Sequence, residues 1–172
     1  PPSIYLGPCP FPLCLHAIAL ITLEDVAGIA LRLYRPEDFL TKVSPVIYAP
    51  DADCPRWRTF ITEIMQGDKA RADYLQKAIG YSLTGDTRME CLFILYGPTS
   101  RNGKGTTMES ILRIMGEYGK NADPTMLQAK FNSQSGGPSE EIARLAGSRF
   151  VNISEPEKKI TLDAALTKRL TG

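Results

Sequence analysis

The sequence CLFILYGPTSRNGKGTT, residues 91–107, places an apolar run, a glycine-rich turn and the start of a helical pattern in succession. Residues 91–96 predict a buried β-strand, and the turn that follows runs from Gly97 to Gly103 and Lys104. Apolar side chains then recur at the spacing of one helix face, at Met108, Ile111, Leu112 and Met115. Strand, glycine loop with lysine, and helix is the order of a P-loop.

The chemistry of phosphate binding explains these residue types. Backbone N–H groups can wrap a phosphate only where no Cβ blocks the turn, which accounts for Gly97, Gly103 and Gly105. The unpaired N–H groups and the dipole of the following helix also attract an anion. Lys104 would bring a positive charge to the β and γ phosphates of ATP, and a nearby hydroxyl would ligate Mg²⁺.

The loop departs from the common G-x-x-x-x-G-K-[ST] spacing in two ways. Five residues separate Gly97 from Gly103, and the position after the lysine is Gly105. The metal-binding hydroxyl must therefore come from Thr106 or, as the second choice, Thr107. The alternative is an ordinary strand-to-helix turn with a chance lysine, but the agreement of strand, glycines, lysine and helix favours the nucleotide loop.

Glu155 is the second candidate for chemistry. Residues 150–153 predict a strand, and an acid at its carboxyl end would project into the crevice where α/β sheets bind ligands. There it can hold Mg²⁺ and orient the attacking water. The alternatives are a solvated turn residue paired with Lys158 or Lys159, or Glu157 in the same role if the strand ends later.

The helical segments around the loop are also predicted from local signals. Residues 57–65 form one helix that ends at Gly67, and a second helix is capped by Asp68 and closed by Gly85. Trp57 is expected to anchor the core of this small helical module rather than to stack on a base. Downstream, we expect a mobile loop over 116–137, a helix from 139 to 147 and a last helix over 162–170.

Composition sets wider bounds. The chain has 172 residues, of which 43% are hydrophobic and 23% charged, as in a soluble globular protein. The net charge of +1 does not indicate a nucleic-acid partner. Residues 56–172 hold 17 Lys and Arg against 13 Asp and Glu, a mild excess of positive charge that is compatible with DNA binding but is far from a basic patch. The four cysteines form no C-x-x-C pair, so reduced cysteines in the cytoplasm are expected.

The N-terminal part gives weaker signals. The apolar segment 11–23, with the only histidine, His16, is too short to cross a membrane, and no Lys or Arg precedes Arg32 as a signal peptide requires. We expect a buried or poorly defined segment, in preference to a targeting sequence, and no membrane partner. Both chain ends look cut, because the chain lacks an initial Met and stops at Gly172.

Five blocks together resemble one family, the helicase part of phage and plasmid primase-helicases within the superfamily 3 helicases. The resemblance covers residues 34–172. It is carried by RPEDFLTKVSPVIYAPDADCPRW (35–57), YLQKAIGYSLTGDT (74–87), LYGPTSRNGKGT (95–106), ARLAGSRFVNISEPEK (143–158) and KRLTG (168–172).

The resemblance implies an α/β fold with a P-loop, AAA-like NTPase core, truncated at its C-terminus and preceded by a small helical module. The implied domains are an irregular leader at 1–34, an extended segment with the helical module at 35–88, and the N-terminal part of the ATPase domain at 89–172. In such a domain Lys104 and Glu155 would be catalytic, with Glu155 as the Walker B acid. The nucleotide would contact Gly97, Asn102, Gly103, Lys104, Gly105, Thr106 and Thr107.

The implied function is ATP hydrolysis that drives a homo-hexamer along single-stranded DNA during phage or plasmid replication in the bacterial cytoplasm. Thr106 and Glu155 would hold Mg²⁺, and Lys168 falls in the block leading to a DNA-contacting hairpin. A primase domain upstream would suit the same family. The sensor residue and arginine finger of the family would lie beyond Gly172, so we expect this chain alone to bind nucleotide weakly and hydrolyse little.

Two other functions stay open at this point. A P-loop kinase for a small molecule would need a lid with several arginines, whereas residues 116–137 offer only Lys120 and Lys130 as cations. A truncated, non-catalytic remnant that acts as a binding or assembly piece would fit the cut ends.

Overall fold

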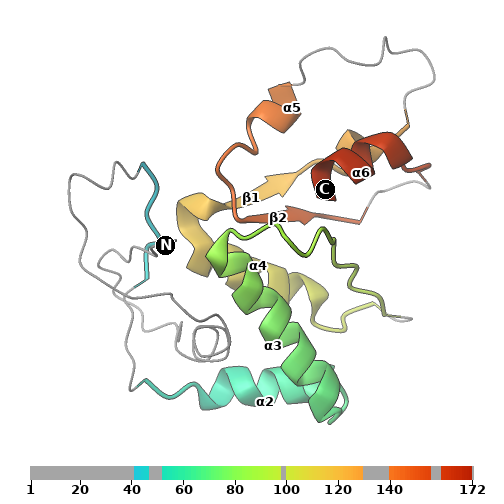
Figure 1. Ribbon diagram of the computed structural model, residues 1–172. Coiled ribbons are helices and arrows are strands. Elements are labelled where there is room, and N and C mark those ends of the chain that lie inside the picture. Colours follow the sequence, from blue (N-terminus) through green and yellow to red (C-terminus); the bar gives the residue numbers. More distant parts are fainter. Residues whose placement is uncertain (1–40, 47–51, 98–99, 130–139, 156–159, 172) are drawn as a thin grey trace.

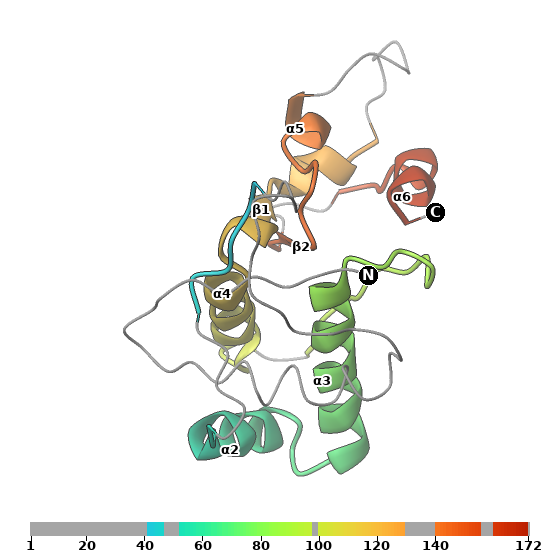
Figure 2. The same cartoon turned by 60° about the vertical axis from the view of Figure 1, so that its left-hand side comes forward.

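The computed structural model describes residues 41–46, 52–97, 100–129, 140–155 and 160–171 (Figure 1). The expectations for the leader at 1–34, for the segment 11–23 with His16 and for Lys158 and Lys159 lie outside the described residues. Helices and a pair of parallel strands make up the regular structure, with helix α4 between the helical module and the strands (Figures 1 and 2).

The helical module consists of α2 (Pro55–Ile64) and α3 (Lys69–Thr84). Asp68 caps α3 as predicted, since its side chain accepts a hydrogen bond of 3.1 Å from the backbone N–H of Arg71. Gly85 ends the helix at φ 68°, a left-handed conformation that favours glycine. Trp57 is partly buried and packs against the core, with its ring 5.7 Å from that of Phe60.

Helix α4 (Lys104–Met115) lies against both the module and the strands. Its predicted apolar face is confirmed, because Ile111 and Met115 are almost fully buried. The core around them joins α4 to both module helices and to the turn that follows α4: Val46, Ile61, Leu75, Ile79, Leu83, Ile111, Ile114, Met115 and Tyr118. None of the described helices has the length and apolar character that crossing a membrane requires.

The two strands are β1 (Gly119–Ala122) and β2 (Phe150–Ile153), which pair in parallel with Gly119 opposite Phe150. A short 3₁₀ turn, η2 (Gly116–Tyr118), leads from α4 into β1, and a second, η3 (Pro124–Leu127), follows it. Helix α5 (Glu140–Ala143) precedes β2 and α6 (Ala164–Thr171) follows it. In both views α5 lies on the far side of the strands from α2 and α3.

Residues 41–46 fasten the chain ahead of the module to the end of α4. Val46 is 1% exposed and belongs to the core. The buried Ser44 hydroxyl donates a hydrogen bond of 2.6 Å to the carbonyl of Ile114, and the Val43 N–H donates one of 2.8 Å to Glu117. This segment therefore packs into the core around α4 rather than forming a separate unit.

Several sequence expectations are corrected; the helix expected from 139 to 147, for example, is limited to α5 (Glu140–Ala143). Residues 91–96 form no strand: the segment is irregular, and Leu92, Phe93, Ile94 and Tyr96 are exposed. An apolar run becomes a strand only where a neighbouring strand receives it, and the described partner of β2 is β1. The expected mobile loop over 116–137 instead contains η2, β1 and η3, while residues 130–139 lie outside the described part.

The expectation of reduced cysteines is wrong for Cys54, which is disulfide-bonded. Disulfide formation depends on which cysteines the fold brings within reach of each other, and the spacing of cysteines along the sequence does not give this. Cys91 is free and exposed.

The Asp68 cap gives a direct test of the module. Replacing Asp68 by Ala removes the acceptor for the Arg71 N–H and should lower the free energy of unfolding by about 1 kcal/mol in urea denaturation. Asp73→Ala is the matched control, because Asp73 lies exposed within α3, and it should change stability by less than about 0.5 kcal/mol. Equal effects of the two substitutions would contradict the capping role.

Candidate functional site

The glycine-rich turn forms a tight loop at the start of α4. Arg101 and Gly103 both have left-handed backbone angles, with φ of 57° and 83°, on either side of Asn102. Left-handed conformations reverse the chain over few residues and are unusual for arginine. Gly103 is the N-cap of α4, so the loop passes directly into the first helical turn.

Gly97, Asn102 and Lys104 come together within this loop. The Lys104 ammonium donates a hydrogen bond of 3.0 Å to the side-chain oxygen of Asn102. A Cβ at position 97 would lie 2.0 Å from the Asn102 amide nitrogen and 3.6 Å from the Lys104 nitrogen. Residue 97 must therefore be glycine for the Asn102 and Lys104 side chains to occupy these positions.

Gly103 lies against the helical module. A Cβ at this position would lie 2.6 Å from the Ile64 methyl carbon Cγ2 and 3.3 Å from the Phe60 ring. Glycine is favoured here for two reasons: a side chain would clash with Ile64, and a φ of 83° is strained for any residue with a side chain. Helix α2 thereby fixes the point where the loop enters α4.

The first turn of α4 suits an anion. It contains no acidic residue, so no side chain offsets the partial positive charge at the helix N-terminus. Thr106 is exposed, whereas Thr107 is fully buried and donates a hydrogen bond of 2.9 Å to the Gly103 carbonyl. Of the two hydroxyls predicted for the metal, that of Thr106 is the accessible one.

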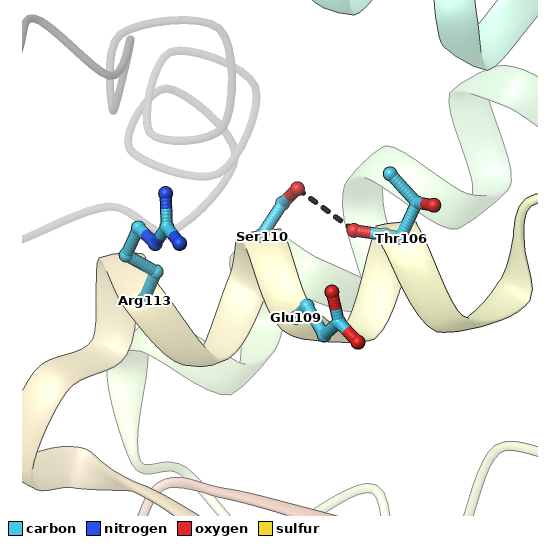
Figure 3. Close-up of a pocket in the computed structure, with 4 residues that line it drawn as sticks. All are labelled: Thr106, Glu109, Ser110 and Arg113. Carbon is cyan, nitrogen blue, oxygen red and sulfur yellow. Dashed lines mark hydrogen bonds between the residues drawn. The ribbon is translucent and has the colours of Figure 1, made fainter.

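A shallow hollow of about 220 Å³ lies along the outer face of α4 rather than in the loop (Figure 3). Thr106, Glu109, Ser110 and Arg113 line it, and the Ser110 hydroxyl donates a hydrogen bond of 2.7 Å to the Thr106 carbonyl. These residues follow one stripe of a single helix. The hollow is therefore a surface feature next to the candidate site.

Glu155 is exposed, two residues after the end of β2. Figure 1 shows that α4 runs opposite to the strands, so that its N-terminus and the carboxyl end of β2 lie on the same side of the molecule. Within the described part of the chain, no hydrogen bond or ion pair joins Glu155 to the loop. The neighbour of β2 is β1, and not the run 91–96 as the sequence predicted.

The remaining predicted site residues lie elsewhere. Lys168 is exposed in the last turn of α6, next to Arg169. Gly105 has open space around the position of a Cβ, so no contact with another part of the protein requires glycine there. Glu157 lies outside the described residues.

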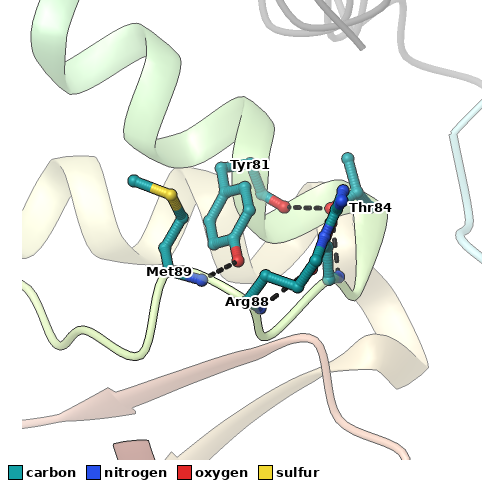
Figure 4. Close-up of polar contacts among 5 residues, drawn as sticks. Tyr81, Thr84, Arg88 and Met89 are labelled. Carbon is teal, nitrogen blue, oxygen red and sulfur yellow. Dashed lines mark hydrogen bonds and ion pairs between the residues drawn. The ribbon is translucent and has the colours of Figure 1, made fainter. Parts of the chain in front are cut away.

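A polar turn connects α3 to the segment that leads into the loop (Figure 4). The Thr84 hydroxyl donates to the Tyr81 carbonyl and accepts from the Asp86 N–H, and the Tyr81 hydroxyl accepts from the Met89 N–H. Hydrogen bonds from the Arg88 side chain and backbone lower the pKa of the Asp86 carboxyl. The same pairing raises the pKa of Arg88.

Asp123 forms a second such turn at the end of β1. Its carboxylate accepts hydrogen bonds from the hydroxyl and the backbone N–H of Thr125, at 2.6 and 2.8 Å. These bonds lower the pKa of Asp123, the side-chain bond having the larger effect. The turn starts η3, since Asp123 is its N-cap.

The sequence prediction missed a junction formed by Arg149 and Tyr118. The Arg149 guanidinium donates to the Leu83 carbonyl at 2.8 Å and lies 4.4 Å from the centre of the Tyr118 ring. The contact joins residues that are 31 and 66 positions apart in the sequence. An arginine directly before a predicted strand was the only local signal.

Two comparisons with known proteins bear on function. The family model described as D5 N terminal like matches residues 22–66. A protein of Acanthamoeba polyphaga mimivirus that is named a putative helicase is 29% identical over 108 residues, which is 63% of this chain. The chain spans only 11% of the length of that relative. No solved structure is significantly similar. These matches support a relationship to helicase-associated proteins.

Two glycines of the loop can be compared directly. Gly103→Ala introduces a side chain at φ 83° against Ile64, and it should destabilise the chain by more than about 1 kcal/mol in urea denaturation. Gly105→Ala enters open space in the first turn of α4 and should be neutral or stabilising by up to about 1 kcal/mol. A harmless Gly103→Ala would show that the loop does not pack on α2 in this way.

Proposed function

We propose that this chain is part of an ATP-driven DNA helicase and that the loop from Gly97 to Thr106 binds the triphosphate. The observation that carries the proposal is the tight packing at Gly97 and Gly103. Because neither residue has a side chain, the loop can fold with Lys104 hydrogen-bonded to Asn102. The similarity to the viral protein named a putative helicase supports the same reading.

The residues of the loop fit a nucleotide with its metal ion. Gly97 and Gly103 allow the main chain to approach a phosphate, and Lys104 supplies the positive charge beside it. The exposed Thr106 hydroxyl and the Glu155 carboxylate are oxygen donors of the kind that Mg²⁺ prefers. When bound, Mg²⁺ would neutralise charge that develops on the phosphate oxygens.

The chain's own groups have separate tasks in this proposal. Asn102 holds the Lys104 ammonium within the loop through their hydrogen bond of 3.0 Å. Glu155 accepts a hydrogen bond from the attacking water and so orients it. The exposed cations Lys168 and Arg169 on α6 are candidates for contact with the phosphates of single-stranded DNA. A homo-hexamer and an upstream primase domain remain part of the proposal by family resemblance.

Substitution of Lys104 tests the proposal. In the complete protein that contains this sequence, Lys104→Ala should abolish ATP hydrolysis stimulated by single-stranded DNA, because the phosphates lose their positive partner. Lys77→Ala, which changes an exposed lysine of α3, is the matched control and should retain full activity. Full DNA-stimulated activity in Lys104→Ala would remove the proposal.

The dependence on DNA separates this function from the two alternatives. A small-molecule kinase would bind ATP through the same loop, but single-stranded DNA would not accelerate its turnover. A non-catalytic remnant would show no hydrolysis even in the complete protein. Measuring ATP turnover with and without single-stranded DNA therefore distinguishes all three.

A further inference from the structure

We propose that Arg149 is a positioning residue for ATP hydrolysis, which sets the place of Glu155 by anchoring the start of β2 to the helical module. The inference rests on the proposed function. Arg149 lies outside the loop proposed to bind the nucleotide. Its contacts with Tyr118 and Leu83 would hold the start of β2 in place.

Three segments meet at Arg149. Its guanidinium donates to the Leu83 carbonyl at the end of α3, and its backbone N–H donates to the Tyr118 carbonyl, both at 2.8 Å. Its side chain also runs along Gly85, where a Cβ would lie 3.3 Å from the guanidinium nitrogen Nε. In both views the end of α3 lies beside the start of β2.

The charge of Arg149 is balanced without a carboxylate. No ion pair includes it within the described residues; the guanidinium instead contacts a helix-terminal carbonyl and the face of the Tyr118 ring. The last carbonyls of a helix lack partners within the helix and carry partial negative charge. A guanidinium can donate to such a carbonyl and stack on an aromatic ring at once, which a lysine ammonium cannot match.

Tyr118 extends the junction to the N-terminal segment. The ring is buried, and its hydroxyl donates a hydrogen bond of 2.8 Å to the Lys42 carbonyl. The Lys42 ammonium in turn donates to the Ala146 carbonyl at 2.7 Å, three residues before Arg149. The chain entering β2 is thus held from both sides.

The position of β2 matters because Glu155 follows it. The strand is only four residues long, so a displacement at Phe150 is carried to its carboxyl end. Arg149 does not contact the loop of Gly97 to Thr106 in the described structure. Loss of the anchor should therefore misplace Glu155 while leaving the nucleotide-binding groups in place.

The test uses the complete protein and separates turnover from nucleotide binding. Arg149→Ala should lower kcat for DNA-stimulated ATP hydrolysis about ten- to a hundredfold, the size of effect expected for a displacement of about 1 Å. The Kd for a fluorescent ATP analogue should change less than about threefold, since only positioning is lost. Arg149→Lys should restore part of kcat because it keeps the charge and one donor.

Substitutions of Tyr118 provide a second, independent test of the contact with Arg149. Tyr118→Leu and Arg149→Ala should be strongly non-additive in kcat, because either change removes the stacked contact. Tyr118→Phe keeps the ring and should retain more activity than Tyr118→Leu. Arg144→Ala, at an exposed arginine five residues earlier, is the matched control and should behave as wild type.

Two results would overturn the inference. One is an unchanged kcat in Arg149→Ala; the other is a parallel loss of kcat, nucleotide affinity and folded fraction by circular dichroism, which indicates a purely structural residue. Neither affects the proposed function as long as Lys104→Ala abolishes hydrolysis. If Lys104→Ala stays active, the proposed function fails whatever the Arg149 variants do.

Discussion

The absence of a side chain at Gly103 is the constraint on which the candidate site depends. Ile64 and Phe60 of α2 occupy the space where a Cβ would lie, and the backbone takes a left-handed turn at the same residue. The helical module and the loop are therefore in direct contact. Because residues 22–66 are the part similar to the D5 N terminal like family, that matched region contributes to the site and is more than a spacer ahead of it.

The features that the sequence predicted correctly are those encoded locally. Asp68 and Gly85 mark the ends of α3 through a side-chain acceptor and a left-handed glycine, and both act within a few residues of their own position. The face of α4 follows from the spacing of its apolar residues, and the bounds of β2 follow from a short apolar run between polar turns. Each of these signals depends only on residues that are close together in the sequence.

The features that were missed depend on partners far along the chain. The run 91–96 is apolar enough for a strand, but pairing is a property of two segments, and β1 takes the place beside β2. The residues of β1, GKNA, carry little apolar signal of their own. Tyr118 and Arg149 are 31 residues apart, and neither residue alone indicates the contact that they form.

The helical module reaches the candidate site at two separate points. Helix α2 contacts the loop at Gly103, and the Leu83 carbonyl near the end of α3 accepts a hydrogen bond from Arg149, the residue before β2. The first contact bears on the groups proposed to hold the phosphates, and the second on the strand that leads to Glu155. A rotation of α2 and α3 as one body would therefore move both halves of the site. Residues 41–46 pack into the same core: Ser44 and Val43 hydrogen-bond to the end of α4 and to the turn that follows it, and Val46 is buried in the cluster that contains residues of α2, α3 and α4.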